Sequence, residues 1–358
     1  MTLPPTRGVE TLFRPFQLKG LTLPNRIVMA PMTRSHSPGG IPGPNVAAYY
    51  RRRAEGGVGL IVTEGTFIND PVAGFDANVP RFHGEDALAG WGRVAEAVHA
   101  AGGLIFPQLW HVGNVPPRDK PLPEHVRPVS PGNANVDLLI DAYAKAARDA
   151  QDLGFDGVEL HGAHGYLIDQ FFWDRTNQRT DHYGGDLVSR TRFGVEVIAE
   201  VRRRIGPDFP LVLRFSQWKL QDYAAKLAQT PQELERFLAP LAAAGVDMFH
   251  CSQRRFWEPE FEGSELNLAG WTKKLTGKPT ITVGSVTLNE DFMTSFGTTN
   301  TAGTDGLDNL LERLEREEFD LVAIGRSLIV NPSWPAIVRR GALNELQPFN
   351  RSVLSELV

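Results

Sequence analysis

Short apolar runs recur along the chain, and each is followed by a segment with apolar residues at helical spacing. A stripe such as Phe193, Val197, Val201 and Ile205 predicts a helix with one buried face. The apolar runs predict eight strands, at residues 27–30, 60–67, 104–109, 157–161, 211–215, 248–252, 280–284 and 321–324. Strands that alternate with helices favour a parallel sheet, and eight such units favour a closed (β/α)8 TIM barrel over an open α/β sheet.

The chain of 358 residues is long for one domain, yet barrels of this type reach that size. No linker rich in Gly and Ser and no change of composition divides it. We therefore expect one barrel domain over residues 1–358, with a barrel-capping loop region at 253–271 and a loop insertion at 297–306.

Composition excludes several classes of function. The net charge of −5 gives no general attraction to nucleic acid or to an anionic membrane, and we expect the arginine-rich segments 51–53 and 202–204 to be solvated helix faces. The first residues lack the apolar core of a signal peptide, and no stretch approaches the ~18 apolar residues of a membrane span. We expect a cytoplasmic protein. With Cys251 as the single cysteine, any redox chemistry requires a non-thiol cofactor.

Polar residues are dense at the predicted carboxyl ends of the strands, where barrel enzymes place their active sites. Loops after the last two strands of such barrels commonly bind a phosphate, since glycine admits close backbone approach and arginine adds charge. The residues at the strand ends are Pro31, Met32, Thr33, Gln108, Trp110, His161, His164, Tyr166, Arg214, Gly284, Ser285, Gly325 and Arg326.

His161 and His164 are three residues apart, a spacing that on a helical turn places both rings on one face. They could donate hydrogen bonds to one carbonyl or nitro oxygen, ligate a metal, or simply be satisfied in buried loops. A metal site needs a third ligand, and no His, Asp or Glu pattern at the other strand ends supplies a compelling one. The donor pair is therefore favoured, with no metal.

Arg214 ends a strand that reads LVLRF and is expected to be buried. A buried cation is costly unless it faces an anion. An anionic ligand in the barrel mouth would supply that anion, and a salt bridge to Glu64 or Glu159 is the alternative.

Six motifs, in this order and spacing, resemble the old yellow enzyme family of FMN-dependent ene-reductases, from about residue 12 to residue 335. They are LFRP at 12–15, PNRIVMAPMTR at 24–34, QLW at 108–110, VELHGAHGYLIDQ at 158–170, NQRTDHYGG at 177–185 and IGRSLIVNP at 324–332. Thr33 stands where a second branch of the family has cysteine, so the chain is more similar to the threonine branch.

The resemblance implies a tightly bound, non-covalent FMN. Pro31, Met32 and Thr33 would lie along the isoalloxazine ring, with the Thr33 hydroxyl donating to flavin O4. Gln108 would pair with the pyrimidine edge, and Arg214 would face N1 and O2. The residues implied to hold the phosphate are Gly284, Ser285, Gly325 and Arg326.

For the substrate, the resemblance implies that His161 and His164 bind its oxygen and that Tyr166 protonates its α-carbon. Trp110 and Phe75 would wall the pocket, although both would equally suit a plain aromatic core. Phe75 stands where many members of the family have a tyrosine.

The implied activity is a ping-pong reaction. NADPH or NADH passes hydride to FMN, and FMN N5 then passes it to the β-carbon of an enone, enal or nitro compound. Small molecules would be the partners of a monomer or homodimer. Two other classes stay open: a metal-dependent barrel hydrolase using His161 and His164 as ligands, and a flavin-binding protein without turnover.

Overall fold

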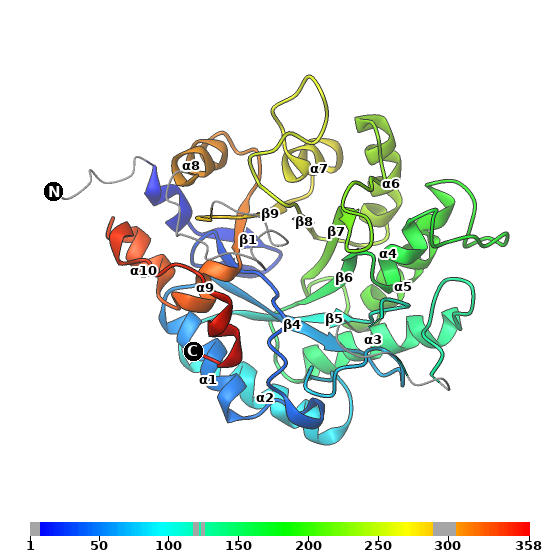
Figure 1. The fold of residues 1–358 in the computed structure, drawn as a ribbon, viewed down its shortest axis with the longest axis horizontal. Coiled ribbons are helices and arrows are strands. Elements are labelled where there is room, and N and C mark those ends of the chain that lie inside the picture. Colours follow the sequence, from blue (N-terminus) through cyan, green and yellow to red (C-terminus); the bar gives the residue numbers. More distant parts are fainter. Residues whose placement is uncertain (1–7, 117–121, 123–125, 289–305) are drawn as a thin grey trace.

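The structure, a computed structural model, describes residues 8–116, 122, 126–288 and 306–358. The insertion expected at residues 297–306 lies outside this part of the chain, apart from Gly306. Within the described ranges, parallel strands surrounded by helices close into a barrel (Figure 1). The predicted (β/α)8 TIM barrel is confirmed.

The barrel strands pair in the order β10-β3-β4-β5-β6-β7-β8-β9, and β10 pairs in turn with β3. Their bounds are β3 Ile27–Met29, β4 Leu60–Phe67, β5 Ile105–Trp110, β6 Val158–His164, β7 Leu211–Lys219, β8 Met248–Ser252, β9 Thr280–Val283 and β10 Leu321–Ile324. Three strands run further than the sequence predicted. β5 continues one residue past Leu109, β6 continues three residues past His161, and β7 continues four residues past Phe215.

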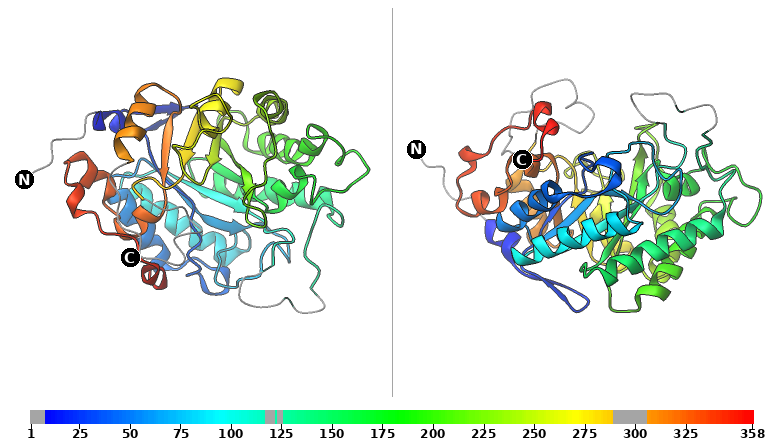
Figure 2. Two further views of the ribbon diagram at one scale, coloured as in Figure 1. Left: turned by 45° about the horizontal axis from the view of Figure 1, so that its top comes forward. Right: turned by 90° about the horizontal axis from the view of Figure 1, so that it is seen from below.

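Helices cover the outside of the barrel, and the right-hand view of Figure 2 shows α1 (blue) and α2 (cyan) side by side. The helices are α1 Pro44–Glu55, α2 Glu85–Ala100, α3 Val136–Asp152, α4 Leu167–Phe172, α5 Arg192–Ile205, α6 Pro231–Ala243, α7 Leu268–Thr276, α8 Leu307–Glu315, α9 Arg326–Val330 and α10 Trp334–Arg339. The stripe predicted on α5 is buried as expected.

One arginine on α1 differs from the expected solvated face. Arg53 is fully buried; its guanidinium lies 3.7 Å from the centre of the Tyr49 ring and donates to the carbonyl oxygens of Leu328 and Ile329. Arg53 also donates to an oxygen of Val358, so an aromatic ring and main-chain oxygens satisfy the buried cation without an acidic side chain. Arg202 is also largely covered, so the solvated-face interpretation is wrong for these two residues.

The amino end of the barrel interior is closed by an apolar cluster. A hairpin of β1 Phe16–Leu18 and β2 Leu21–Leu23 inserts Leu18 and Leu23 beneath the strands. The cluster that they join is Val28, Ala30, Leu60, Val62, Phe106, Val212, Met248, Ile281, Leu321 and Ala323. The polar side chains of the interior therefore lie toward the carboxyl ends of the strands.

Candidate active site

On β7 and β8, the side chains that face the barrel interior change from apolar to polar between one inward-facing residue and the next, two positions later. On β7, Val212 belongs to the apolar cluster, and Arg214, two residues later, is buried above it. On β8, Met248 gives way in the same manner to His250 and then to Ser252. Side chains alternate between the two faces of a strand, so residues two apart share the barrel interior. The register sets Arg214 beside His161 on one side and beside His250 on the other.

Four aromatic side chains gather at the ends of β5 and β6. The His161 ring stacks on Trp110 at 6.0 Å between centroids, and its centroid lies 5.2 Å from that of His164. Tyr166, the residue before α4, meets the edges of Trp110 and of His161, each at 4.9 Å. The structure therefore brings together four of the five side chains that the sequence assigned to the substrate pocket.

The geometric reason given for the histidine pair is corrected. His161 and His164 lie on a strand, not on a helical turn, and strand alternation alone would send residues three apart to opposite faces. An irregularity in the pairing of β6 with β7 falls between Gly162 and His164, and His164 has φ of 66°. Such a bulge re-aims side chains. The His164 N–H donates to Ser216 Oγ at 2.9 Å, which holds this conformation.

Both histidines are neutral hydrogen-bonding groups. Burial, and next the Arg214 guanidinium, lower the pKa of His161 and of His164 well below the ordinary value. The Ala163 N–H donates to His161 Nδ1 at 3.3 Å, so the proton of a neutral His161 ring is on Nε2. His164 Nε2 lies 2.7 Å from Ser252 Oγ. The pair can offer N–H donors without carrying charge.

Arg214 is 6% exposed and reaches only Ser252 Oγ, at 3.4 Å, by a side-chain hydrogen bond. Within the described residues its Nε has no partner and no carboxylate lies within 4.0 Å of its guanidinium, so the alternative salt bridge to Glu64 or Glu159 is not formed. Burial lowers the pKa of Arg214, and Glu159 partly opposes that shift. A buried, unsatisfied guanidinium is suited to an anionic ligand.

The loops after β9 and β10 meet as the sequence predicted. Gly284 has φ of 150°, and a Cβ placed there would lie 2.9 Å from the carbonyl oxygen of Gln253 and 3.0 Å from the Arg255 nitrogen, so the backbone requires glycine. Ser285 follows with φ of 51°, and Arg326 Nη2 lies 3.5 Å from Ser285 Oγ. Backbone turns with positive φ beside an arginine form concavities that suit phosphate.

The segment after β3 borders this cradle. A Cβ on Gly325 would lie 3.4 Å from Met32 Sδ, while Thr33 next to Met32 is exposed. Glu64 Oε2 accepts the N–H groups of Arg34 and Ser35 at 2.8 and 3.2 Å and so fixes the end of the segment. Burial raises the pKa of Glu64 to about 7.

Phe75 lies on a loop beside the end of β5, apart from the cluster of aromatic rings around His161. Its loop is tied to the end of β5, because the Val112 N–H donates to the carbonyl oxygen of Ala73 at 2.8 Å. Phe75 itself is partly buried against the main hydrophobic core. Among the ring contacts of the described residues, none joins it to Trp110 or to the histidines.

Two residues of the cluster were missed from the sequence. Trp218, on the extension of β7, stacks on His164 at 4.4 Å and donates its indole N–H to the carbonyl oxygen of Ser252 at 3.1 Å. Ser252 in turn contacts both His164 and Arg214. Ser252 could have been found from the alternation of side chains along a strand, because it lies four residues after the inward-facing Met248. Trp218 lies beyond the apolar run, which gave no signal for it.

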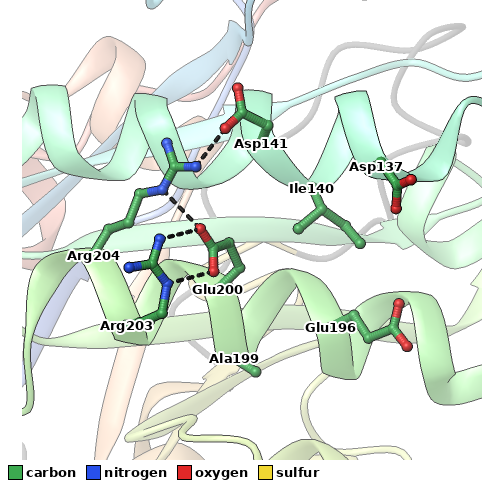
Figure 3. Close-up of a pocket in the computed structure, with 8 residues that line it drawn as sticks. All are labelled: Asp137, Ile140, Asp141, Glu196, Ala199, Glu200, Arg203 and Arg204. Carbon is green, nitrogen blue, oxygen red and sulfur yellow. Dashed lines mark hydrogen bonds and ion pairs between the residues drawn. The ribbon is translucent and has the colours of Figure 1, made fainter.

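A hollow of about 480 Å³ lies outside the barrel between α3 and α5. Four of its charged side chains pair with one another: Arg203 and Arg204 bind Glu200 at 2.7 and 2.9 Å, and Arg204 also binds Asp141 (Figure 3). These contacts couple the two helices.

Two further findings concern only the described residues. No group of three or more His, Cys, Asp or Glu side chains is arranged to hold a metal ion, and His161 and His164 accordingly have no third such neighbour. Nor does any helix have both the length and the apolar character needed to cross a bilayer.

Comparison with known proteins gives a consistent picture. The model of the NADH:flavin oxidoreductase / NADH oxidase family matches residues 11–345. 12-Oxophytodienoate reductase 7 of Oryza sativa subsp. japonica is 34% identical, over 93% of this chain and 88% of that protein. The structure of morphinone reductase in complex with tetrahydroNAD aligns with a TM-score of 0.77 at 30% identity, covering 96% of this chain and 93% of that one. An old yellow enzyme homologue from Zymomonas mobilis aligns with a TM-score of 0.76 at 28% identity, covering 96% of each chain.

Proposed function

The chain belongs to the NADH:flavin oxidoreductase / NADH oxidase family, and from that premise we propose that it is an FMN-dependent ene-reductase of activated C=C bonds. The observation that carries the proposal is the cluster of neutral histidines and Tyr166 above a buried, unsatisfied Arg214. Similarity to a 12-oxophytodienoate reductase and to morphinone reductase supports the same reaction class.

The residues of the barrel mouth fit FMN. The buried guanidinium of Arg214 would face the anionic N1–O2 edge of the flavin, and the Gln108 amide would pair with the pyrimidine edge. Pro31, Met32 and Thr33 would line the ring, with the Thr33 hydroxyl at O4, as in the threonine branch of the family. The phosphate would be held by Gly284, Ser285, Gly325 and Arg326, whose loops already converge.

When bound, FMN would take a hydride from NADPH or NADH and return it from N5 to the β-carbon of the substrate, in two alternating half-reactions. A hydride carries both electrons, so the reduced product also needs one proton at its α-carbon. Tyr166 would supply that proton, since its ring borders His161 and Trp110 above the same opening.

His161 and His164 would bind the carbonyl or nitro oxygen of the substrate. Their neutral N–H groups withdraw electron density from the double bond and stabilise the negative charge that develops on that oxygen. A fixed donor already aimed at the developing charge needs no reorganisation during the reaction. Trp110 would wall the pocket, and Phe75 would border it from its loop.

The remaining features are proposed on the same basis. Residues 1–358 would form one barrel domain, with segment 253–271 capping the barrel mouth. The enzyme would act in the cytoplasm as a monomer or homodimer, on small enones, enals or nitro compounds. Nucleic acid and membranes would not be its partners.

An anaerobic titration of the purified protein tests the proposal. Addition of NADH or NADPH should bleach the flavin absorbance, and a cyclic enone added to the reduced protein should restore it with one saturated product per flavin. A colourless protein would favour the metal-dependent hydrolase. A yellow protein inert to both nucleotides and to enones would favour flavin binding without turnover.

A further inference from the structure

A carboxylate and an imidazole that the proposed mechanism does not use are buried below the histidine cluster. Glu159 on β6 and His250 on β8 are both fully buried, and His250 Nδ1 lies 2.7 Å from Glu159 Oε2. The other carboxylate oxygen, Oε1, accepts from Gln108 Nε2 at 2.7 Å. These two bonds join β5, β6 and β8 in one polar layer above the apolar cluster at the amino end of the barrel.

The chemistry of these bonds fixes the orientation of Gln108. An ionised carboxylate only accepts hydrogen bonds, so Gln108 must turn its NH₂ group toward Glu159. The amide oxygen is left for another partner, and it lies on the side of Gly65, where a Cβ would approach it to 3.3 Å. Glu159 therefore determines that Gln108 offers an acceptor, not a donor, to the pyrimidine edge of a flavin.

Both hydrogen bonds to Glu159 come from neutral groups. Burial lowers the pKa of His250, which leaves the ring neutral with its proton on Nδ1. His250 Nε2 is buried without a partner among the described residues. Neither bond cancels the charge of Glu159 as a contacting cation would.

Arg214 is the cation that faces this carboxylate within the barrel. It lies in register with His250, its guanidinium is buried, and it forms no ion pair within the described chain. The other titratable groups around it, His161 and His164, are neutral, and Tyr166 is uncharged in its phenol form. One positive and one negative charge therefore share the interior without contact, where the field of each is poorly screened.

We propose that Glu159 is a positioning residue that orients the Gln108 amide for FMN binding, and that its charge, by offsetting that of Arg214, lowers the reduction potential of bound FMN. The inference rests on the proposed function. A negative charge in this layer opposes the additional negative charge of a reduced flavin. Glu159 then favours hydride delivery to the substrate at the expense of hydride uptake from the nucleotide.

The test compares Glu159→Gln with wild type in the FMN-loaded protein. Glutamine has the same shape and keeps an oxygen for Gln108, but removes the charge. The ratio of the dissociation constants of oxidised and reduced FMN should rise at least tenfold, equivalent to about +30 mV for a two-electron couple in a spectroelectrochemical titration. Reduction by NADPH should become faster and reoxidation by cyclohexenone slower.

Asp247→Asn is the matched control. Asp247 is 8% exposed at the amino end of the barrel, where it accepts the Leu211 N–H at 3.0 Å and pairs with Arg202. Asp247→Asn should lower the free energy of unfolding and leave the ratio of the dissociation constants of oxidised and reduced FMN unchanged. An unchanged or lower potential in Glu159→Gln would overturn the inference, and an equal shift in both variants would do the same.

A second variant keeps the test decisive if Glu159→Gln fails to fold. Glu159→Asp retains the charge but is too short to hold both Gln108 and His250. It should weaken oxidised and reduced FMN binding alike, with less than a twofold change in their ratio. A tenfold change would refute the role of the charge. Wild-type protein that takes up no FMN would instead contradict the proposed function itself.

Discussion

Val212 and Arg214 face the same barrel interior two residues apart on β7, and they show how differently the two ends of the barrel are built. At the amino end, Val212 belongs to the apolar cluster that Leu18 and Leu23 of the β1–β2 hairpin complete. At the carboxyl end, Arg214 and His250 are buried with nitrogen atoms that lack partners in the described structure. Burying unsatisfied polar groups costs stability, whereas burying apolar ones supplies it. One end therefore stabilises the fold, and the other is suited to a ligand.

The comparison predicts its largest effect for the histidine pair. Replacing His161 and His164 together by alanine should weaken the binding of a phenol, whose oxyanion mimics the substrate oxygen, by up to about 3–6 kcal/mol. Two hydrogen bonds to a charged group at about 1.5–3 kcal/mol each set that ceiling. The long-wavelength charge-transfer band measures the affinity, and FMN content serves as the control. Unchanged phenol affinity would remove the pair from the site.

Tyr166 tests whether the polar end also moves a proton. Tyr166→Phe should leave FMN binding and reduction by NADPH near wild type, and slow reoxidation by a cyclic enone by about 10²–10⁴-fold, the usual contribution of a general acid. A nitro-olefin, whose nitronate can leave unprotonated, should still accept hydride at nearly the wild-type rate. Equal slowing with both substrates in stopped-flow traces would assign Tyr166 to substrate positioning instead.

Met248 tests the apolar end. Met248→Ala should lower the free energy of unfolding by about 2–5 kcal/mol, the usual cost of truncating a large core side chain. FMN affinity should change less than twofold. Ser252→Ala is its matched partner on the same strand and should do the reverse, with weaker phenol binding and little loss of stability. Urea unfolding and phenol titration measure the two effects. Equal losses of stability and of phenol affinity in the two variants would contradict the division of the barrel into a stabilising amino end and a ligand-binding carboxyl end.

The smallest expected effect is a dependence of the free energy of unfolding on pH, which we assign to Glu64. Burial raises its pKa from 4.5 to about 7, so the folded protein favours the protonated acid. This contribution is complete below pH 4.5 and is lost as the pH rises through about 7, for a total of up to about 3 kcal/mol. Urea unfolding between pH 4.5 and 8 should show the decline. Glu64→Gln should flatten it, and an equal slope in that variant would assign the dependence to other groups.

Much of this organisation was predictable from the sequence. Apolar runs located all eight barrel strands, and the polar residues after the last two strands indicated loops that the structure brings together, with Arg326 beside Ser285. What escaped prediction depends on tertiary contacts. Lys219 is buried at the end of β7, where it pairs with Asp169 at 2.7 Å. The polar residues that precede it gave no indication that the strand continues this far. The bulge before His164 likewise follows from pairing with β7, which no local pattern records.

Arg214 provides the most direct test of the claim that the carboxyl end of the barrel is an FMN site. A structural arginine and a ligand-binding arginine predict opposite results for Arg214→Met. If the guanidinium awaits an anion, its removal relieves an unsatisfied buried charge, so the flavin-free protein should melt at the same or a higher temperature. FMN should bind at least tenfold more weakly and be reduced more slowly by NADPH. A flavin-free protein that is strongly destabilised, with FMN affinity and reduction unchanged, would contradict the account.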